Sequence, residues 1–381
     1  MNSYKEIKEV LNNIPNDRAI IIAGHENADM DSIGSSLALA YFLNKIGKND
    51  ISVLIDKKDK YKIQWFNNNK FIVQDISRKD YVFIMVDLNR KQRLGIYENY
   101  FDNARLTINI DHHENNKKES NYIISDENIS STAEMIFNLI NEFDTKIDEN
   151  IASLLYAGIL TDTAGFSHRL TPKTFETMSK LLECGINYKY ITKKVFLERT
   201  MKEAKALSKM LSEINYDVFH YIIINKNDEI FSSLEYSMLF KKMVPILKNI
   251  EDIKVLGIFL IDNDKVFGEF KANIDIDMSK LAERFGGGGH KDSAGFESEL
   301  DIAEILKISK EYIEESSKWA TFFVLGTVLF AKRTVPNTKK LYIIYWKILQ
   351  NVLKYWNSIT NGKIRKRRIT WIYQIYSPNF I

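Results

Sequence analysis

The sequence predicts an α/β fold in which a parallel-sheet N-terminal domain is joined by a helical connector to a smaller α+β domain. Short apolar runs rich in β-branched residues alternate with amphipathic stretches in the first half of the chain, and this alternation is typical of a parallel sheet with helices on both faces. The chain has 381 residues, enough for two ordinary domains. Its composition, 45% apolar and 27% charged, is that of a soluble globular protein.

The N-terminal sheet is predicted from near-continuous apolar runs, which are typical of strands buried on both faces. The predicted strands are 18–24, 51–55, 81–87 and 107–111. Helical spacing predicts helices over 32–47, 131–143 and 150–162. Ser130, Ser131 or Thr132 could cap the second of these helices, with Glu134 placed for a capping box.

The second half begins with a long helical segment, about 173–214, which contains the predicted connector. Strands follow over 219–226, 254–262 and 265–273, with a turn at 262–265 and helical stretches at 237–250, 278–285 and 301–316. The predicted organisation is a domain over 1–185, a connector over 186–215, a smaller domain over 216–316 and an extension over 317–381.

The C-terminal extension differs in composition from the rest of the chain. After Ser317 it has 12 Lys and Arg, no Asp or Glu, and four of the five tryptophans, so the overall charge of +3 divides into −9 before this point and +12 after it. Its apolar run at 321–331 is shorter than the ~20 residues of a membrane span, and its basic run at 363–368 could bind nucleic acid or an anionic surface. A translated frame-shift or an accessory extension would both produce such a sequence, so we assign it no function.

The expected location is the cytoplasm. A single cysteine, Cys184, excludes an internal disulfide, and this is typical of a reducing compartment. The first ten residues are polar and helical in pattern, unlike a signal peptide. We therefore expect a cytoplasmic protein with no stable membrane span.

Acidic and histidine side chains follow four separate apolar runs. His25, Asp29 and Asp31 follow the first strand, and the two aspartates, two residues apart, would share one face of an extended loop. The other members of the set are Asp87, Asp111, His112, His113 and Asp162. Because ligands bind outside the carboxyl ends of parallel strands, we expect these five acids and three histidines to meet at one edge of the sheet.

The crowding of these carboxylates predicts a metal site. Close carboxylates raise each other's pKa and destabilise the fold, and divalent cations reverse that effect. Carboxylate and imidazole ligands together suit Mn²⁺, Fe²⁺, Co²⁺ or Zn²⁺, and six or seven ligands fit two ions ~3.5–4 Å apart. Structural alternatives exist for Asp31 as a helix N-cap, for Asp87 as a turn residue and for the paired histidines as surface residues. The joint pattern favours the metal site.

A second candidate site lies in the segment FGGGGHKDSAGF, residues 285–296. Four glycines are costly inside a helix or strand, but they allow backbone N–H groups to approach an anion closely. His290 follows them as a further donor. A flexible hairpin turn is the structural alternative, and the length of the glycine run favours phosphate or carboxylate binding.

Together these motifs resemble the DHH phosphoesterase superfamily. The matching features are His25-x3-Asp29-x-Asp31 with Gly34-Ser35, the single Asp87, the triplet Asp111-His112-His113, the run Ser131-Thr132-Ala133-Glu134, and Asp162-Thr163. The GGGGH segment resembles the C-terminal domain of RecJ-like members, and the order and spacing match over about residues 15–315. The most similar subgroup is the stand-alone nano-RNases, or oligoribonucleases, which are often also phosphatases of 3′-phosphoadenosine-5′-phosphate.

The resemblance implies a role for each residue. One Mn²⁺ would be held by His25, Asp29 and Asp87. A second would be held by Asp31, Asp87, His112 and Asp162, with Asp87 as the bridge. His113 would face the scissile phosphate or its leaving group, and Asp111 would orient the histidines. The residues that would bind the terminal end of the substrate across an interdomain cleft are Gly287, Gly288, Gly289 and His290.

The chain also departs from the family pattern. Lys271-Ala272 stands where an Arg-Ser pair is usual, and lysine keeps the charge but lacks the bidentate fork that suits phosphate. After Asp162 the usual basic stretch is replaced by residues 165–169, where either His168 or Arg169 is a candidate contact to a nucleotide phosphate. Glu26 occupies a variable position and receives no role.

The expected activity is a Mn²⁺-dependent phosphodiesterase that degrades short RNAs of two to five residues, by attack on phosphorus of a hydroxide held between two ions. The charge of −9 before the extension agrees with short substrates, because enzymes of long polynucleotides have basic channels. Two alternatives stay open: a phosphodiesterase of linear dinucleotides such as pApA, and a non-enzymatic nucleotide- or RNA-binding protein. A homodimer is also left open.

Overall fold

The computed structural model describes residues 2–67, 69–232, 234 and 243–316. The chain divides into two compact units, Met1–Glu198 and Arg199–Ile381, and each is described by itself. The extension predicted over 317–381 lies outside the described residues, as do residues 237–242 of the helical stretch predicted over 237–250. Within the described ranges, no helix is long and apolar enough to cross a membrane.

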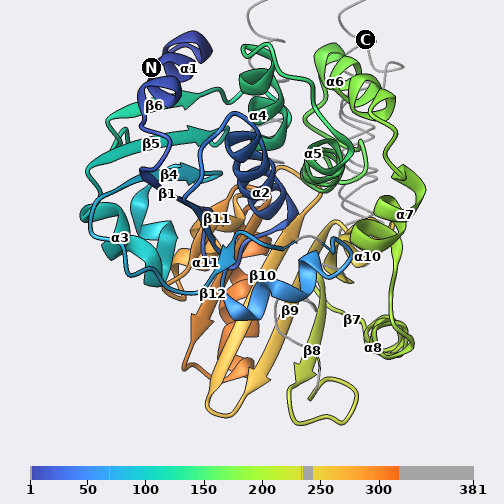
Figure 1. Cartoon of the computed structure of the whole chain (residues 1–381). Helices are drawn as coiled ribbons and strands as arrows, with labels where there is room; N and C mark the ends of the chain where they lie inside the picture. Colours follow the sequence, from blue (N-terminus) through green and yellow to red (C-terminus); the bar gives the residue numbers. More distant parts are fainter. Residues whose placement is uncertain (1, 68, 233, 235–242, 317–381) are drawn as a thin grey trace, which may run out of the picture. The chain divides into compact units, whose positions relative to one another are not determined.

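Unit 1 contains a six-stranded sheet whose strands are all parallel, as the sequence predicts. Its order is β3-β2-β1-β4-β5-β6, so β1 lies next to β4 at the point where the chain reverses its direction of winding (Figure 1). The strands are β1 (Ala19–Ala23), β2 (Ile51–Leu54), β3 (Ile72–Val73), β4 (Tyr81–Val86), β5 (Leu106–Asp111) and β6 (Tyr122–Ser125). In such sheets this reversal point forms the ligand crevice at the carboxyl ends of the strands.

Helical segments cover both faces of this sheet. Side chains alternate between the faces, so Ile20 and Ile22 belong to one apolar core and Ile21 to the other. On the first face lie α1 (Tyr4–Asn13), α2 (Met30–Lys45), α4 (Thr132–Asn141) and α5 (Glu149–Asp162). On the second lie the 3₁₀ segment η2 (Lys91–Tyr97) and α3 (Glu98–Asp102). A further 3₁₀ segment, η1 (Lys57–Ile63), follows β2.

The helical segment predicted over about 173–214 is broken into several pieces. These are α6 (Pro172–Glu183), α7 (Tyr188–Thr192), the π-helical η3 (Lys193–Leu197) and α8 (Met201–Ser212). Gly185 has a φ of +83° after the end of α6, and Thr200 caps α8 in a capping box with Glu203. The predicted segment is therefore helical in separate pieces, because a helix stop and a new N-cap interrupt the apolar pattern.

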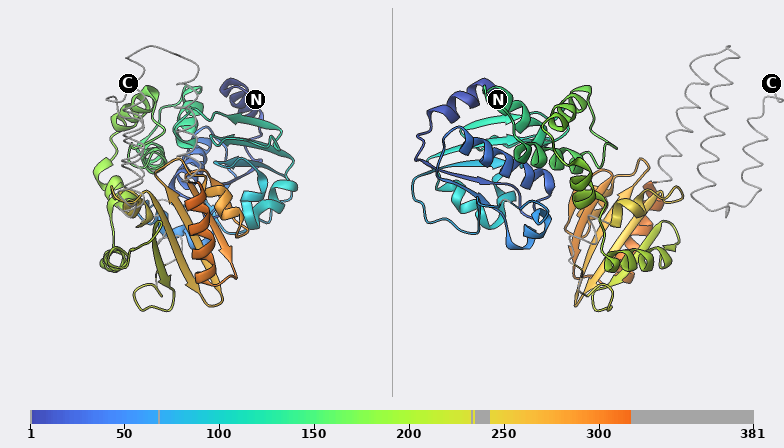
Figure 2. Two further views of the ribbon diagram at one scale, coloured as in Figure 1. Left: turned by 180° about the vertical axis from the view of Figure 1, so that it is seen from behind. Right: turned by 45° about the vertical axis from the view of Figure 1, so that its right-hand side comes forward.

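Unit 2 contains a second six-stranded sheet, in the order β11-β12-β10-β9-β8-β7, which is mixed because β8 and β9 are parallel. The strands are β7 (Asn215–Tyr216), β8 (His220–Asn225), β9 (Val255–Asp262), β10 (Lys265–Ala272), β11 (Gly288–His290) and β12 (Ser293–Ser298). The predicted turn joins β9 to β10, and Asn263 adopts a φ of +52° there. Two short helices, α10 (Val244–Lys248) and α11 (Met278–Glu283), complete this α+β unit with the helix over 302–316, which packs along the sheet (Figure 2).

Candidate metal centre

The turn after β1 places three of the predicted residues at the sheet edge. His25 follows the strand and is buried. Asp29 is the N-cap of α2, since its Oδ1 accepts the Ser32 amide N–H at 3.1 Å, and Asp31 lies in the first turn of that helix. The expectation of an extended loop was therefore wrong, and the N-cap alternative weighed for Asp31 belongs to Asp29.

The tautomer of His25 follows from its surroundings. Its Nδ1 lies 2.8 Å from the backbone carbonyl oxygen of Glu26, and because a carbonyl only accepts, Nδ1 carries the proton. The lone pair is therefore on Nε2, which lies 3.6 Å from both Asp29 Oδ2 and Asp87 Oδ2. An imidazole held by a backbone carbonyl on its other nitrogen has the arrangement of many metal-bound histidines. Glu26, which received no role, contributes through its backbone.

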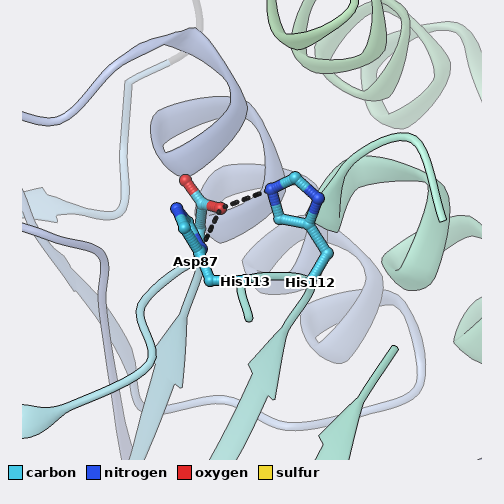
Figure 3. A group of neighbouring side chains, drawn as sticks. All are labelled: Asp87, His112 and His113. Carbon is cyan, nitrogen blue, oxygen red and sulfur yellow. Dashed lines mark ion pairs between the residues drawn. The ribbon is translucent and has the colours of Figure 1, made fainter. Parts of the chain in front are cut away.

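Asp87 stands at the centre of the arrangement. It follows β4, is buried, and has a φ of +68°, a strained conformation for a non-glycine residue. Its Oδ1 lies 3.6 Å from His112 Nε2 and 3.7 Å from His113 Nδ1, whereas its other oxygen, Oδ2, faces His25. Figure 3 shows this carboxylate facing both histidines. A carboxylate whose two oxygens face different imidazoles has the geometry of a bridging ligand.

Among the residues that the structure describes, three groups of side chains have ligand atoms within 4.8 Å of one another. They are His25–Asp29–Asp87, Asp31–His112–Asp162 and Asp87–His112–His113. Asp162, at the end of α5, belongs to the second group, and its Oδ2 lies 3.5 Å from His112 Nε2. The fold thus brings all six residues predicted as ligands to one edge, from the loop after β1, from α2, from the ends of β4 and β5, and from α5.

The electrostatics of this cluster are unfavourable without cations. Burial raises the pKa of Asp31 and of Asp162 to about 7, with repulsion from neighbouring carboxylates as the second cause. Burial, followed by repulsion from Asp31, holds the pKa of Asp87 well above its ordinary value. Burial also lowers the pKa of the His112 imidazole, which keeps it neutral and able to coordinate.

Buried polar atoms without a hydrogen-bond partner also indicate a metal centre. Within the described part of the chain, Asp162 Oδ2 and His112 Nδ1 are buried without a hydrogen-bond partner. Buried polar groups are rarely left in this condition. A carboxylate and imidazole donor set with an uncompensated oxygen fits a divalent transition-metal cation.

Asp111 and His113 form a pair beside the cluster. The Asp111 carboxylate is fully buried, and its Oδ1 accepts the His113 amide at 3.2 Å and lies 2.7 Å from His113 Nδ1. Asn116 Nδ2 donates to the other oxygen at 2.9 Å. Asp111 therefore orients His113, whose Nε2 stays available for other contacts. Sequence reasoning missed Asn116, which lies outside every motif.

The N-terminus of α4 meets the cluster from the other side. The amides of Thr132 and Ala133 donate to the two oxygens of Asp31 at 2.8 and 2.9 Å. Among the three candidate caps, Ser131 holds the position, since its Oγ accepts the Glu134 amide at 3.1 Å. Glu134 accepts hydrogen bonds from the Ser130 and Thr174 hydroxyls, so the capping box predicted for its carboxylate does not form.

Backbone strain is concentrated at this edge. Of the eight non-glycine residues with positive φ in the described ranges, seven lie in the segments that follow β1, β4, β5 and α5: Asn27, Asp87, Asn115, Lys118, Ala164, Phe166 and Arg169. Such conformations gather at functional sites. Arg169 and His168 are both exposed, and Arg169 Nη1 lies 3.9 Å from Asp162 Oδ2.

The glycine segment of unit 2 forms a β-hairpin. Gly288–His290 is the strand β11 and pairs with β12 across Lys291-Asp292. The expectation that this run avoids strand structure was wrong for its second half. A Cβ at Gly287 or Gly289 would lie 2.2 or 2.6 Å from a backbone oxygen of β12, so close strand approach requires glycine there. Lys271 Nζ lies 2.5 Å from Ser293 Oγ and 2.6 Å from Glu269, so part of its charge is compensated.

Two family profiles match this chain. The DHH family, N-terminal domain, matches residues 19–159, and the DHHA1 domain matches residues 237–315. The chain belongs to the DHH family. This DHH phosphoesterase is 29% identical over 311 residues to an uncharacterized protein of Mycoplasma genitalium, with 77% of this chain and 91% of that protein covered. It is 24% identical over 316 residues to the bifunctional oligoribonuclease and PAP phosphatase NrnA of Bacillus subtilis, with 77% of this chain and 95% of that protein covered.

Solved structures share the fold of this DHH protein. An exopolyphosphatase-related protein from Bacteroides fragilis matches with a TM-score of 0.73 at 22% identity, over 82% of this chain and 95% of that one. The two-sheet α/β architecture is therefore that of the DHH family, and the chain is a metal-dependent hydrolase.

Proposed function

We propose that this DHH phosphodiesterase hydrolyses short oligoribonucleotides to mononucleotides with two Mn²⁺ ions. The observation that carries the proposal is the position of Asp87, whose two oxygens face His25 on one side and His112 on the other. One carboxylate shared by two candidate ligand groups is what a pair of close cations requires. Such a pair suits hydrolysis of a phosphodiester.

The ligands would be divided between two ions. His25, Asp29 and Asp87 would hold the first, and Asp31, Asp87, His112 and Asp162 the second. Bound cations of this kind neutralise charge on the scissile phosphate and lower the pKa of a water molecule that attacks it. Arg169 Nη1 lies 3.9 Å from Asp162 Oδ2, and this guanidinium offsets part of the charge of that carboxylate.

The remaining residues would position the substrate. His113, held by Asp111 through Nδ1, would present Nε2 to the phosphate or to the leaving oxygen. Arg169 is the better of the two candidate phosphate contacts after Asp162, because its guanidinium already approaches that carboxylate. In unit 2, the exposed residues Gly288, Gly289 and His290, together with Gly287 and Lys271, would bind the far end of the substrate.

Two observations support short substrates. NrnA of Bacillus subtilis is named as an oligoribonuclease, and the alignment covers 95% of its length. The chain before the extension carries a net charge of −9, whereas proteins that track along polynucleotides have basic grooves. We therefore expect RNAs of two to five residues to be preferred over long strands.

The test incubates the full chain and Mn²⁺ with four substrates: a 5-mer RNA, a 24-mer RNA, pApA and 3′-phosphoadenosine-5′-phosphate. End-labelled RNA gives the direction of cleavage. The expected result is release of mononucleotides from the 5-mer, at least ten-fold faster per molecule than from the 24-mer. Asp126→Asn is the control variant and should hydrolyse RNA like the native protein, because Asp126 is an exposed aspartate after β6 and lies outside the candidate metal-binding groups. Cleavage of pApA alone would favour the dinucleotide alternative, and binding without hydrolysis would favour a non-enzymatic module.

A further inference from the structure

Thr132 contacts one carboxylate from each of the two sets of candidate ligands. Its amide donates to Asp31 Oδ2 at 2.8 Å, and its hydroxyl Oγ1 donates to Asp87 Oδ1 at 2.9 Å. Thr132 is fully buried, so water does not compete for either bond. The same residue therefore links the helix α2 and the end of β4 at the centre of the site.

The local fold fixes the direction of the Thr132 hydroxyl. Thr132 is the first residue of α4, directly after the N-cap Ser131, whose backbone is extended. The next amide, that of Ala133, is also committed to Asp31, so the first turn of α4 is anchored at two points. A β-branched side chain on such a backbone has few χ1 choices.

The hydrogen bond from the Thr132 hydroxyl matters because few other contacts orient the Asp87 carboxylate. It is the only side-chain hydrogen bond of that carboxylate within the described ranges. Oδ1, the oxygen that it reaches, faces His112 and His113, while Oδ2 faces His25. A donor on Oδ1 hinders rotation of the carboxylate that would turn Oδ2 away from His25.

We propose that Thr132 is a positioning residue whose hydroxyl holds Asp87 so that one oxygen serves each ion. The inference rests on the proposed function, since it needs two cations at these ligands. Residues that hydrogen-bond to metal ligands typically change metal affinity or activity by about 10- to 100-fold when mutated. We expect a loss of this size in the affinity for Mn²⁺ when the hydroxyl is removed.

The experiment measures Mn²⁺ binding by calorimetry and the magnetic coupling of the two ions by electron paramagnetic resonance. Thr132→Val removes the hydroxyl at nearly constant volume, and Thr132→Ser keeps it. Thr174→Val is the matched control, because it removes a buried hydroxyl that donates to a carboxylate outside the ligand set, Glu134, at 3.0 Å. If Thr132→Val does not fold, Thr132→Ala is compared with Thr132→Ser instead.

The expected result is a loss of about 10- to 100-fold in Mn²⁺ affinity and an altered coupling signal in Thr132→Val, with Thr132→Ser within about three-fold of the native protein. Thr174→Val should bind both ions normally even if it melts at a lower temperature. Equal binding by the native protein and Thr132→Val, or an equal defect in the Ser and Val variants, would overturn the inference. Absence of Mn²⁺ binding by the native protein would instead refute the proposed function.

Discussion

The crowded carboxylates should destabilise unit 1 when no metal is bound, and Asp162→Asn tests this directly. Burial raises the pKa of Asp162 to about 7 in the folded protein, against about 3.9 in an unfolded chain. The folded state therefore binds more protons than the unfolded state between these values, and stability falls as pH rises from about 4 through 7. Asparagine has nearly the same shape and no charge to bury.

The size of the effect follows from the two pKa values. One pKa unit corresponds to about 1.4 kcal/mol, so the metal-free variant should be up to ~4 kcal/mol more stable than the native protein at pH 8. The same relation leaves a difference of about 1.5 kcal/mol at pH 5 and almost none below pH 4. Saturating Mn²⁺ should reverse the order, because the native protein has one more ligand than the variant and gains more stability from binding the cation.

The assay is urea unfolding of metal-free protein, followed by hydrogen exchange in peptides that contain β4 and β5, so that unit 1 is observed by itself. Native and variant protein are compared at the same pH, which removes the intrinsic pH dependence of exchange. A variant that is less stable than the native protein at pH 8 without metal would refute the reasoning, as would a difference that does not change between pH 8 and pH 5.

Three further predictions concern activity. Asp87→Ala should abolish hydrolysis and lower metal content more than any other single ligand change, and a mutant with two bound metals and half its activity would contradict the bridging role. His290→Ala should raise KM for short RNA by roughly ten-fold or more, since one charge-assisted hydrogen bond contributes about 1.5–3 kcal/mol, whereas loss of metal from that variant would show that His290 belongs to the other site. Truncation after Ser316 should leave kcat/KM on short RNA within about three-fold, or under ~0.7 kcal/mol; a hundred-fold loss would show that the extension is part of the enzyme.

The longer strands of unit 1, and the meeting of the candidate ligand residues at their ends, were predictable because each of these strands is a near-continuous apolar run. Topology then brings the carboxyl ends of parallel strands together, so Asp87 and His112 meet although neither is near the other in sequence. The strands β3 and β6 were missed, and the two residues of β3 are too few to carry a pattern.

Contacts that depend on helix starts were harder to predict. Asp29 and Asp31 were expected in an extended loop, but α2 begins between them. The amides that hold Asp31 come from α4, about 100 residues later in the chain, and only the fold pairs them. For the glycine run, the cost of glycine in a strand was outweighed by the close approach of β12, which excludes a Cβ.

The six candidate ligands are spread from His25 to Asp162, over β1, α2, β4, β5 and α5. An unfolded chain cannot offer them together, because closing several long loops around an ion costs conformational entropy at each closure. Cations at this site would act as cross-links that exist only once nearly all of unit 1 has assembled, after the folding transition state. We therefore expect metal to slow the unfolding rate while leaving the folding rate almost unchanged, so that the lifetime of the folded enzyme depends on the metal supply.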